Sequence, residues 1–297
     1  MSPFLLSNPD AYQRWRDEKL SKFPSSISDL MVEIRDLNQL SLAEKTAIRG
    51  CVKRAGFALY KGPVEASKEN VQALGEQFGL VRLDHNPYAD DDAISSLQAS
   101  HDTGHDTGHV TGRKMYIPYT NKALNWHTDG YYNEPHLTIQ SMILHCVRSA
   151  GLDGGTNQFF DPEMAYLLMR EADLDWIKAL QNKTAMTIPG NADDDFVQRG
   201  DSSGPVFSVH KASGSLQMRY TARKRHVIWA DDKATTQAVD FLQNLLGGPY
   251  TFKHRLEPGE GLISTNILHT RSRFEDGDNQ HQKRLMLRAR FYDRLVL

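Results

Sequence analysis

A histidine and an aspartate two residues apart are the residues of this chain best placed to do chemistry. His127 and Asp129 lie in the segment Asn-Trp-His-Thr-Asp. On an extended strand, alternate side chains point to the same face, so this imidazole and this carboxylate would project side by side. A second imidazole from the distant His269 would complete a cap of two imidazoles and one carboxylate. Such a cap leaves open positions on a metal and is the ligand set of non-haem Fe(II) oxygenases.

Arginines mark one face of the last strand that the sequence predicts. Arg284, Arg288 and Arg290 alternate with apolar residues between positions 284 and 292. A solvated strand face would explain these arginines, but a strand of a closed or double sheet also has an interior face. We expect Arg284 and Arg288 to face a site, where Arg284 would supply a fixed cation for a diacid co-substrate.

The bulk properties of the chain exclude several classes of protein. The 297 residues carry a net charge of -2, which gives no general electrostatic attraction to nucleic acid or to an anionic membrane. Cys51 and Cys146 form no CxxC motif and suit a reducing cytosol. No stretch reaches the length of a membrane span, and the first twenty residues lack the apolar run of a signal peptide. We expect a cytoplasmic protein that acts on a small molecule, and its oligomeric state, a homo-oligomer included, stays open.

The first eighty residues mix predicted helices and strands. Residues 1–29 are expected to form a helical arm, with amphipathic spacing over 8–20, and residues 30–297 a single domain. Strands are predicted at 31–37 and 57–60, and helices at 43–54 and 67–78. Ser41 and Glu44 form a capping-box pair before the first of these two helices, and Gly56 would end it.

Short strands prevail from residue 123 onward. Strands are predicted at 136–147, 184–189, 206–209, 215–220 and 262–266, besides the arginine-rich strand at the end. A helix begins at Asp161-Pro162, and another spans 234–246. Many short strands separated by Gly and Pro turns indicate a mainly β protein with flanking helices, built as a barrel or a double-sheet jelly roll. No GxGxxG or GxxxxGK[ST] motif appears, which disfavours a nucleotide-binding fold.

The segment 84–120 is predicted to be a long loop. It contains a near-repeat, His101-Asp-Thr-Gly, His105-Asp-Thr-Gly and His109-Val-Thr-Gly. Its composition favours a Gly-rich surface loop. Long loops in compact domains are often functional, so a metal site and a lid over the active site remain as alternatives.

In combination, these motifs resemble a known family. His127-Thr-Asp129, Gly154-Gly-Thr156, His269 and Arg284 occur in the order found in the taurine dioxygenase superfamily, and some segments are similar to γ-butyrobetaine hydroxylases. The resemblance covers about residues 30–295. It implies a double-stranded β-helix core of the jelly-roll or cupin type. It also implies an Fe(II)- and 2-oxoglutarate-dependent dioxygenase, with O2 as the second co-substrate.

The resemblance also implies roles for individual residues. His127, Asp129 and His269 would bind Fe(II), and Arg284 would bind the distal carboxylate of 2-oxoglutarate with a hydroxyl donor from Thr156. Arg288 would contact the keto-acid carboxylate or an anionic substrate. The Gly-Gly alignment leaves Asn157 as an alternative to Thr156. Two departures from the family weaken particular substrates: Ala123 replaces an Asn of the taurine enzymes, and the zinc module of γ-butyrobetaine hydroxylases is absent.

The substrate is expected to be small and polar, and a zwitterion would suit the candidate partners for both an anion and a cation. Candidate pocket residues are Tyr116, Tyr131, Tyr132 and Arg219. Clustered aromatic rings can hold a quaternary ammonium by cation–π contact, although such rings more often only pack. An arginine near the metal favours a carboxylate, sulfonate or phosphonate. We expect hydroxylation with release of succinate and CO2, while desaturation and ring formation begin with the same hydrogen abstraction and stay open.

Two other functions use the same residues. A sensor protein could bind metal and 2-oxoglutarate without turnover, but the complete triad and Arg284 count against it. A zinc hydrolase could also use two imidazoles and a carboxylate. No HExxH helix lies beside the triad, which disfavours the hydrolase.

Overall fold

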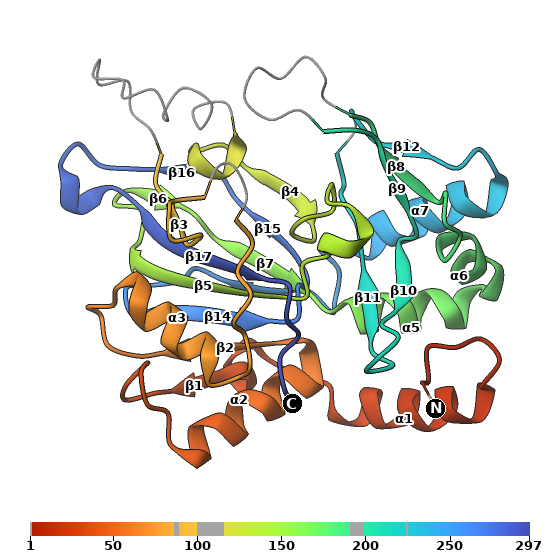
Figure 1. The fold of residues 1–297 in the computed structure, drawn as a ribbon, viewed down its shortest axis with the longest axis horizontal. Coiled ribbons are helices and arrows are strands. Elements are labelled where there is room, and N and C mark those ends of the chain that lie inside the picture. The colour runs from red at the N-terminus through yellow and green to blue at the C-terminus, as the bar shows by residue number, and fades with distance from the viewer. Residues whose placement is uncertain (1, 86–88, 100–115, 191–198, 224) are drawn as a thin grey trace.

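A six-stranded sheet and a four-stranded sheet form the frame of the protein (Figure 1). The computed structural model describes residues 2–85, 89–99, 116–190, 199–223 and 225–297. In spatial order, the strands of the larger sheet are β1 (Met31–Glu33), β2 (Phe57–Lys61), β14 (Glu260–Ser264), β5 (Ser141–Arg148), β17 (Leu285–Phe291) and β3 (Ser95–Leu97). Only the β1–β2 pair of this sheet is parallel.

The smaller sheet carries the strands that the triad needs. Its spatial order is β13 (Phe252–His254), β7 (Asn157–Phe160), β15 (Leu268–Arg271) and β4 (Leu124–His127). Three further small sheets consist of β12 (Ile228–Trp229), β8 (Met186–Ile188) and β9 (Ser202–Gly204), of β10 (Phe207–Val209) and β11 (Leu216–Met218), and of β16 (Phe274–Glu275) and β6 (Asp153–Gly154). The two main sheets confirm the expected jelly-roll type of core, and the described strands form separate sheets instead of a closed barrel.

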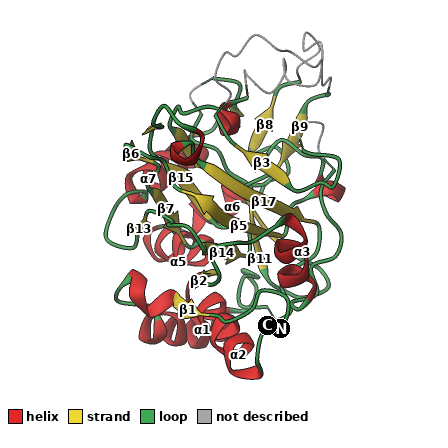
Figure 2. Ribbon diagram, turned by 90° about the vertical axis from the view of Figure 1, so that its left-hand side faces the viewer, coloured by secondary structure: helices red, strands yellow, loops and turns green. Residues whose placement is uncertain are grey.

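Helices cover the outside of this frame (Figure 2). They are α1 (Pro9–Lys22), α2 (Leu42–Ala55), α3 (Lys68–Glu76), α5 (Pro162–Ala172), α6 (Leu174–Leu180) and α7 (Lys233–Leu245), with short 3-10 turns η1 (Ile27–Leu30), η2 (Ile117–Tyr119), η3 (Pro135–Leu137) and η4 (Gln280–Gln282). Helix α2 packs against β2, and α3 packs against β5 and β17. Across the described ranges, no helix has both the length and the apolar character that crossing a bilayer requires.

Local sequence signals explain where α2 begins and ends. The Ser41 hydroxyl accepts a hydrogen bond from the Glu44 N–H at 3.3 Å, and the Glu44 carboxylate accepts one from the Ser41 N–H at 2.6 Å. Gly56 then adopts the left-handed conformation, with φ +79°, which a side chain would disfavour. The predicted capping box and stop are confirmed.

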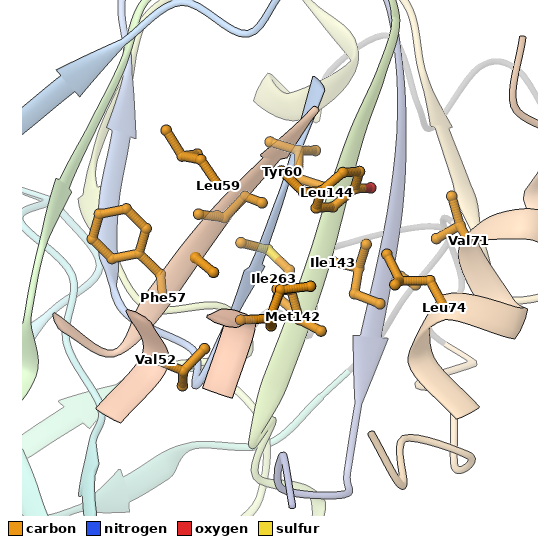
Figure 3. Packing of buried hydrophobic residues seen from close by; sticks show 14 of the residues in the cluster. Val52, Phe57, Leu59, Tyr60, Val71, Leu74, Met142, Ile143, Leu144 and Ile263 are labelled. Carbon is orange, nitrogen blue, oxygen red and sulfur yellow. The ribbon is translucent and has the colours of Figure 1, made fainter. Parts of the chain in front are cut away.

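The main core lies between the two sheets and beneath α2 and α3 (Figure 3). Phe57 of β2 contacts Phe159 of β7, with ring centroids 5.1 Å apart, and so joins the larger sheet to the smaller one. On the helical side, buried apolar residues of α3, such as Val71 and Leu74, pack near Ile143 of β5. A second apolar cluster joins α5, α6 and α7 to β11. The two clusters fix β4, β7 and β15, the strands that carry the site.

Several predicted elements differ in their bounds. The first strand ends at Glu33 instead of residue 37, and the strand predicted from 136 begins at Ser141, because η3 occupies Pro135–Leu137. The segment 84–120 is not wholly irregular, since β3 pairs with β17 and η2 precedes β4. Helix α6 was not predicted. The near-repeat of His101, His105 and His109 lies outside the described residues.

The predicted N-terminal arm is a helix that is joined to the body by buried charges. Lys19 of α1 is 5% exposed, and its ammonium lies 2.5 Å from the Asp161 carboxylate and 2.9 Å from that of Glu163. Burial opposes the charge on Lys19, but the two carboxylates outweigh that effect and raise its pKa. Asp161 also caps α5 by accepting the Glu163 N–H at 2.9 Å. The arm therefore contacts the helix that follows β7.

We expect Lys19→Ala to lower the free energy of unfolding by about 3 kcal/mol, because it leaves the Asp161 carboxylate buried and unpaired. Lys22→Ala is the matched control. It removes an exposed pair with Glu18 on the same helix, and exposed pairs contribute about 0.5 kcal/mol or less. Urea unfolding of both variants measures the difference, and equal stabilities would show that the buried contacts do not hold the arm.

Candidate active site

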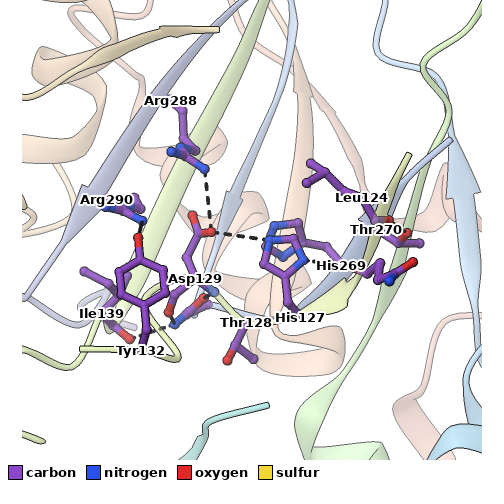
Figure 4. Close-up of polar contacts among 12 residues, drawn as sticks. Leu124, His127, Thr128, Asp129, Tyr132, Ile139, His269, Thr270, Arg288 and Arg290 are labelled. Carbon is purple, nitrogen blue, oxygen red and sulfur yellow. Dashed lines mark hydrogen bonds and ion pairs between the residues drawn. The ribbon is translucent and has the colours of Figure 1, made fainter. Parts of the chain in front are cut away.

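The structure brings His127, Asp129 and His269 together. Their ligand atoms all lie within 4.8 Å of one another, and no other such group of His, Cys, Asp and Glu occurs among the described residues. His127 ends β4 and pairs directly with His269 of β15. The two imidazole centroids are 4.3 Å apart, and Nε2 of His127 lies 3.6 Å from the nearer oxygen of Asp129 (Figure 4).

Backbone carbonyls fix the orientation of both imidazoles. Nδ1 of His127 lies 2.8 Å from the carbonyl oxygen of Asn125, and Nδ1 of His269 lies 3.0 Å from that of Ile267. A carbonyl only accepts, so each Nδ1 carries a proton, which leaves each Nε2 as the ring nitrogen available to a metal. Burial, followed by the proximity of His127, lowers the pKa of His269 to about 4. His269 is therefore neutral near pH 7, and its Nε2 offers the lone pair that a metal binds.

The third ligand is a buried carboxylate held in its charged form. Asp129 is 5% exposed, and its burial alone would raise its pKa. Arg288, whose Nη1 lies 3.7 Å from an Asp129 oxygen, and His127 outweigh that effect and hold the pKa well below its usual range. The other carboxylate oxygen of Asp129 is buried without a hydrogen-bond partner. A buried carboxylate beside two imidazoles, with one of its oxygens left without a hydrogen-bond partner among the described residues, fits a divalent cation.

Asn266 positions Asp129 and is a functional residue that sequence reasoning missed. Its Oδ1 accepts the Asp129 N–H at 2.7 Å, while its Nδ2 donates to the carbonyl oxygens of Asp129 and Ile139, both at 2.9 Å. Asn266 is 5% exposed and has a φ of +55°, a conformation that Asn and Asp adopt more readily than other side chains. The side-chain amide of Asn266 therefore binds both the backbone N–H and the backbone carbonyl of Asp129.

We expect Asn266→Asp to weaken Mn(II) binding by roughly 10–100-fold, as loss of an outer hydrogen bond to a metal ligand usually does. The aspartate tolerates the same φ, but it would place a carboxylate oxygen against two carbonyls. Asn244→Asp, on the exposed face of α7, makes the same change of charge away from the site. Calorimetric titration of Mn(II) compares the two variants. Equal affinities would mean that Asn266 only stabilises the fold.

Arg284 is a buried cation without a counter-ion. It is 5% exposed, its guanidinium lies over the Phe274 ring at 5.1 Å, and burial lowers its pKa to about 10. It forms no ion pair with any described residue, although Asp276 accepts its backbone N–H at 2.9 Å. A buried guanidinium normally pairs with an anion. Arg284 therefore fits the carboxylate of a bound diacid.

Asn157, and not Thr156, lies beside Arg284. A small cavity is lined by Gly155, Asn157 and Arg284 together with Ser149, Ala150, Gly154, Arg255, Leu256 and Met286. Asn157 is buried, and its side-chain oxygen has no hydrogen-bond partner. Thr156 is half-buried outside this cavity, where its backbone pairs with Ser272. Gly155, at φ +76°, brings the chain close to the Arg284 side chain.

The predicted tyrosines line a pocket at the triad. Tyr116, Tyr131 and Tyr132 surround it with His127, Asp129 and Arg288. The Tyr116 and Tyr132 hydroxyls are 3.0 Å apart, and Tyr132 accepts from Arg290 at 3.1 Å. Arg290 also forms an ion pair with Asp84, which leaves Arg288 as the arginine of β17 that faces the pocket. Two guanidinium nitrogens of Arg288, Nε and Nη2, have no partner.

Arg219 does not line this pocket. Its guanidinium donates to the carbonyl oxygens of Tyr131 at 2.7 Å, Met186 at 2.8 Å and Ser202 at 2.6 Å. These bonds join β11 to β8, β9 and the Tyr131 turn. In the structure, Arg219 holds the backbone beneath the pocket in place.

A second buried arginine holds the pocket from the other side. Arg271 of β15 is 3% exposed and donates to the carbonyl oxygens of Thr120, at 2.9 Å, and Lys122. It thereby fixes the segment between η2 and β4. The role of Arg271 could not be predicted from the sequence, because its partners are backbone carbonyls, which no residue type reveals.

Comparison with known proteins agrees with this geometry. A search of curated protein sequences gave no match. Among solved structures, the chain is similar to PvcB from Pseudomonas aeruginosa, at 16% identity and a TM-score of 0.58 over 89% of this chain and 85% of that one. It is also similar to an asparagine oxygenase in complex with Fe(II), 3-hydroxyasparagine and succinate, at 13% identity and a TM-score of 0.58 over 90% of this chain and 94% of that one. These similarities show a common fold and confirm the predicted double-stranded β-helix class.

The family model extends over nearly the whole chain. Residues 18–290 match the model described as taurine catabolism dioxygenase TauD, TfdA family. The matched region includes His127, Asp129 and His269 together with Arg284 and Arg288. With its triad of two histidines and one aspartate assembled, the chain belongs to the TauD/TfdA family of dioxygenases.

Proposed function

We propose that the protein hydroxylates a small polar substrate with an anionic group, using Fe(II), 2-oxoglutarate and O2. The observation that carries the substrate class is Arg288, which is 5% exposed, lines the pocket at the triad and has two guanidinium nitrogens without partners. A carboxylate, sulfonate or phosphonate would satisfy these donors. The tyrosines that line the same pocket would accept a cationic group, so a zwitterion such as an amino acid or a betaine would use both kinds of residue.

The residues of the site would have separate roles in binding the metal and 2-oxoglutarate. His127, Asp129 and His269 would hold Fe(II) and leave open positions for 2-oxoglutarate and O2. Arg284 would bind the distal carboxylate of 2-oxoglutarate, and Asn157, whose Nδ2 donates to the Thr270 carbonyl at 3.4 Å, lines the same cavity. When bound, the metal and 2-oxoglutarate supply the oxidising chemistry: substrate, 2-oxoglutarate and O2 become hydroxylated substrate, succinate and CO2.

Buried arginines make the site favourable for binding these anions. Arg271, Arg284 and Arg288 are all buried, and burial together with mutual repulsion lowers the pKa of Arg271 to about 9. Asp276 opposes the shift in the pKa of Arg271, and the charge of Arg288 acts on Asp129. Fixed donors in a site of low dielectric bind anions strongly and need no reorganisation. Arg288, which pairs weakly with Asp129, orients the substrate close to the metal.

Succinate formation tests the proposal. Protein reconstituted with Fe(II) and ascorbate is supplied with O2, 2-oxoglutarate and a panel of amino acids, betaines, sulfonates and phosphonates. We expect succinate formation to rise with at least one anionic or zwitterionic compound. Binding of Fe(II) and 2-oxoglutarate without stimulated turnover would favour a sensor, and turnover of purely cationic compounds alone would contradict the role of Arg288.

A further inference from the structure

The cavity at the triad is small, and a much larger groove adjoins it. The inner cavity measures about 70 Å³, whereas small-molecule sites typically measure roughly 300–1,000 Å³. The outer groove measures about 1060 Å³. Both are lined by Ala123, Leu124, Asn125 and Arg223, so the two adjoin along β4 and at Arg223. A substrate that outgrows the inner cavity on the Arg223 side would extend into the groove.

The charged residues that line the groove are all arginines within the described part of the chain. Arg223 and Arg225 are exposed along it, Arg271 is buried, and none of the described lining residues is an aspartate or a glutamate. Neither Arg223 nor Arg225 forms an ion pair with a described residue. Trp126 and Gln158 form part of the opposite wall. In a protein with a net charge of -2, such a cluster of unpaired cations beside the site favours anionic ligands.

The backbone fixes these cations at the edge of β4. Thr221 forms a bridge with His127, and the Ala222 N–H donates to the Trp126 carbonyl at 2.8 Å. Arg223 follows directly and lines both the inner cavity and the groove. Burial raises the pKa of the Tyr131 phenol, and the charge of Arg223 opposes that rise, so Arg223 acts electrostatically on the pocket itself.

We propose that the substrate is an elongated molecule with a second anionic group, a carboxylate or a phosphate, which Arg223 and Arg225 bind outside the inner cavity. This inference rests on the proposed function, because the first anionic group is the one that Arg288 holds near the metal. Arg223, where the inner cavity and the groove adjoin, would select for the length of the substrate. Arg225, further along the groove, would bind the same distal group and tolerate a longer spacer.

Binding of matched probes tests this substrate class. Protein saturated with Mn(II) and N-oxalylglycine is titrated calorimetrically with N-succinyl, N-glutaryl and N-adipoyl amino acids and with their terminal amides. A second series compares N-hydroxyacyl amino acids with their phosphate esters. Because N-oxalylglycine fills the 2-oxoglutarate site, the probes report on the remaining pocket and groove. We expect the anionic member of at least one pair to bind tenfold more tightly or better, and the series in which it does so identifies carboxylate or phosphate.

Charge reversal assigns the effect to the groove. Arg223→Glu and Arg225→Glu should each weaken the anionic member at least tenfold and change the neutral member less than twofold. Arg14→Glu, on the exposed face of α1, makes the same change of charge far from the groove and should change neither. Equal affinities within every pair, including no binding of either member, would overturn the inference. Failure of Mn(II) and N-oxalylglycine to bind would instead overturn the proposed function.

Discussion

His127→Ala and Asp129→Ala should each abolish tight Fe(II) binding and reduce succinate formation to the level of the metal-free blank. Each substitution removes one of only three protein ligands. The expected loss of metal affinity exceeds the roughly 10–100-fold that follows loss of an outer hydrogen bond. Asp129→Ala also leaves Arg288 without the carboxylate that lies 3.7 Å from its Nη1. Calorimetric titration of Mn(II) measures the binding, and a coupled assay measures succinate.

His281→Ala is the matched control for His127, because His281 is exposed in η4 and outside the site. It should bind Mn(II) and turn over like the unsubstituted protein. The circular dichroism of all variants should be unchanged, since the triad is held by strand pairing and by Asn266. Full activity of either His127→Ala or Asp129→Ala would remove the triad from the mechanism.

The residues of the triad could be predicted from sequence, although the expected strand geometry was only partly right. The HxD pair was expected to project from one strand, but β4 ends at His127, and Asp129 lies in the turn that follows, where Asn266 binds its backbone. The partner strand was harder to place. The predicted strand 262–266 was expected to enter His269, but Asn266 turns the chain with a φ of +55° and His269 lies in a separate strand of the other sheet. The order of the motifs along the sequence was enough to select His269. Only the fold shows that His269 pairs with His127.

The roles of polar residues near the site could not be predicted in the same way. Asn266, Arg219 and Arg271 act by binding backbone carbonyls, and the positions of carbonyls follow from tertiary structure and not from residue type. The sequence does not show which face of a short strand Arg219 occupies, and Arg219 was therefore predicted as a substrate ligand. Its donors are instead used by the backbone carbonyls of Met186 in β8, Ser202 in β9 and Tyr131 in a turn.

The two candidates for the 2-oxoglutarate contact are adjacent residues. Asn157 begins β7 and Thr156 immediately precedes it, and neighbouring side chains along a strand point to opposite faces. Gly154 and Gly155 both have positive φ, so sequence periodicity cannot set the register across them. The pairing of Asn157 with Arg271 places Asn157 on the inner face. The role of Thr156 in binding stays a prediction, which Thr156→Val and Asn157→Ala would separate by their effects on 2-oxoglutarate affinity.

Arg284→Met should weaken 2-oxoglutarate binding at least 30-fold, and it should leave the stability of the ligand-free protein unchanged or higher. Truncating one partner of a buried charge pair costs about 2–5 kcal/mol of binding free energy. In the ligand-free protein, however, Arg284 has no ion pair with a described residue, and burial has already lowered its pKa to about 10. Replacing a buried, unpaired cation with an apolar side chain of similar length removes a desolvation penalty.

A second buried arginine, Arg271, provides the comparison, because its substitution should change the stability in the opposite direction. Arg271→Met should destabilise the protein by about 1–3 kcal/mol, because it leaves the carbonyls of Thr120 and Lys122 without their donor. Thermal unfolding of both variants, with and without 2-oxoglutarate, measures the two effects together. If Arg284 binds the co-substrate, 2-oxoglutarate should raise the Tm of Arg271→Met but not that of Arg284→Met. A Tm of Arg284→Met well below that of the unsubstituted protein would instead make Arg284 a structural residue, because its charge would then be stabilised within the fold and not reserved for a ligand.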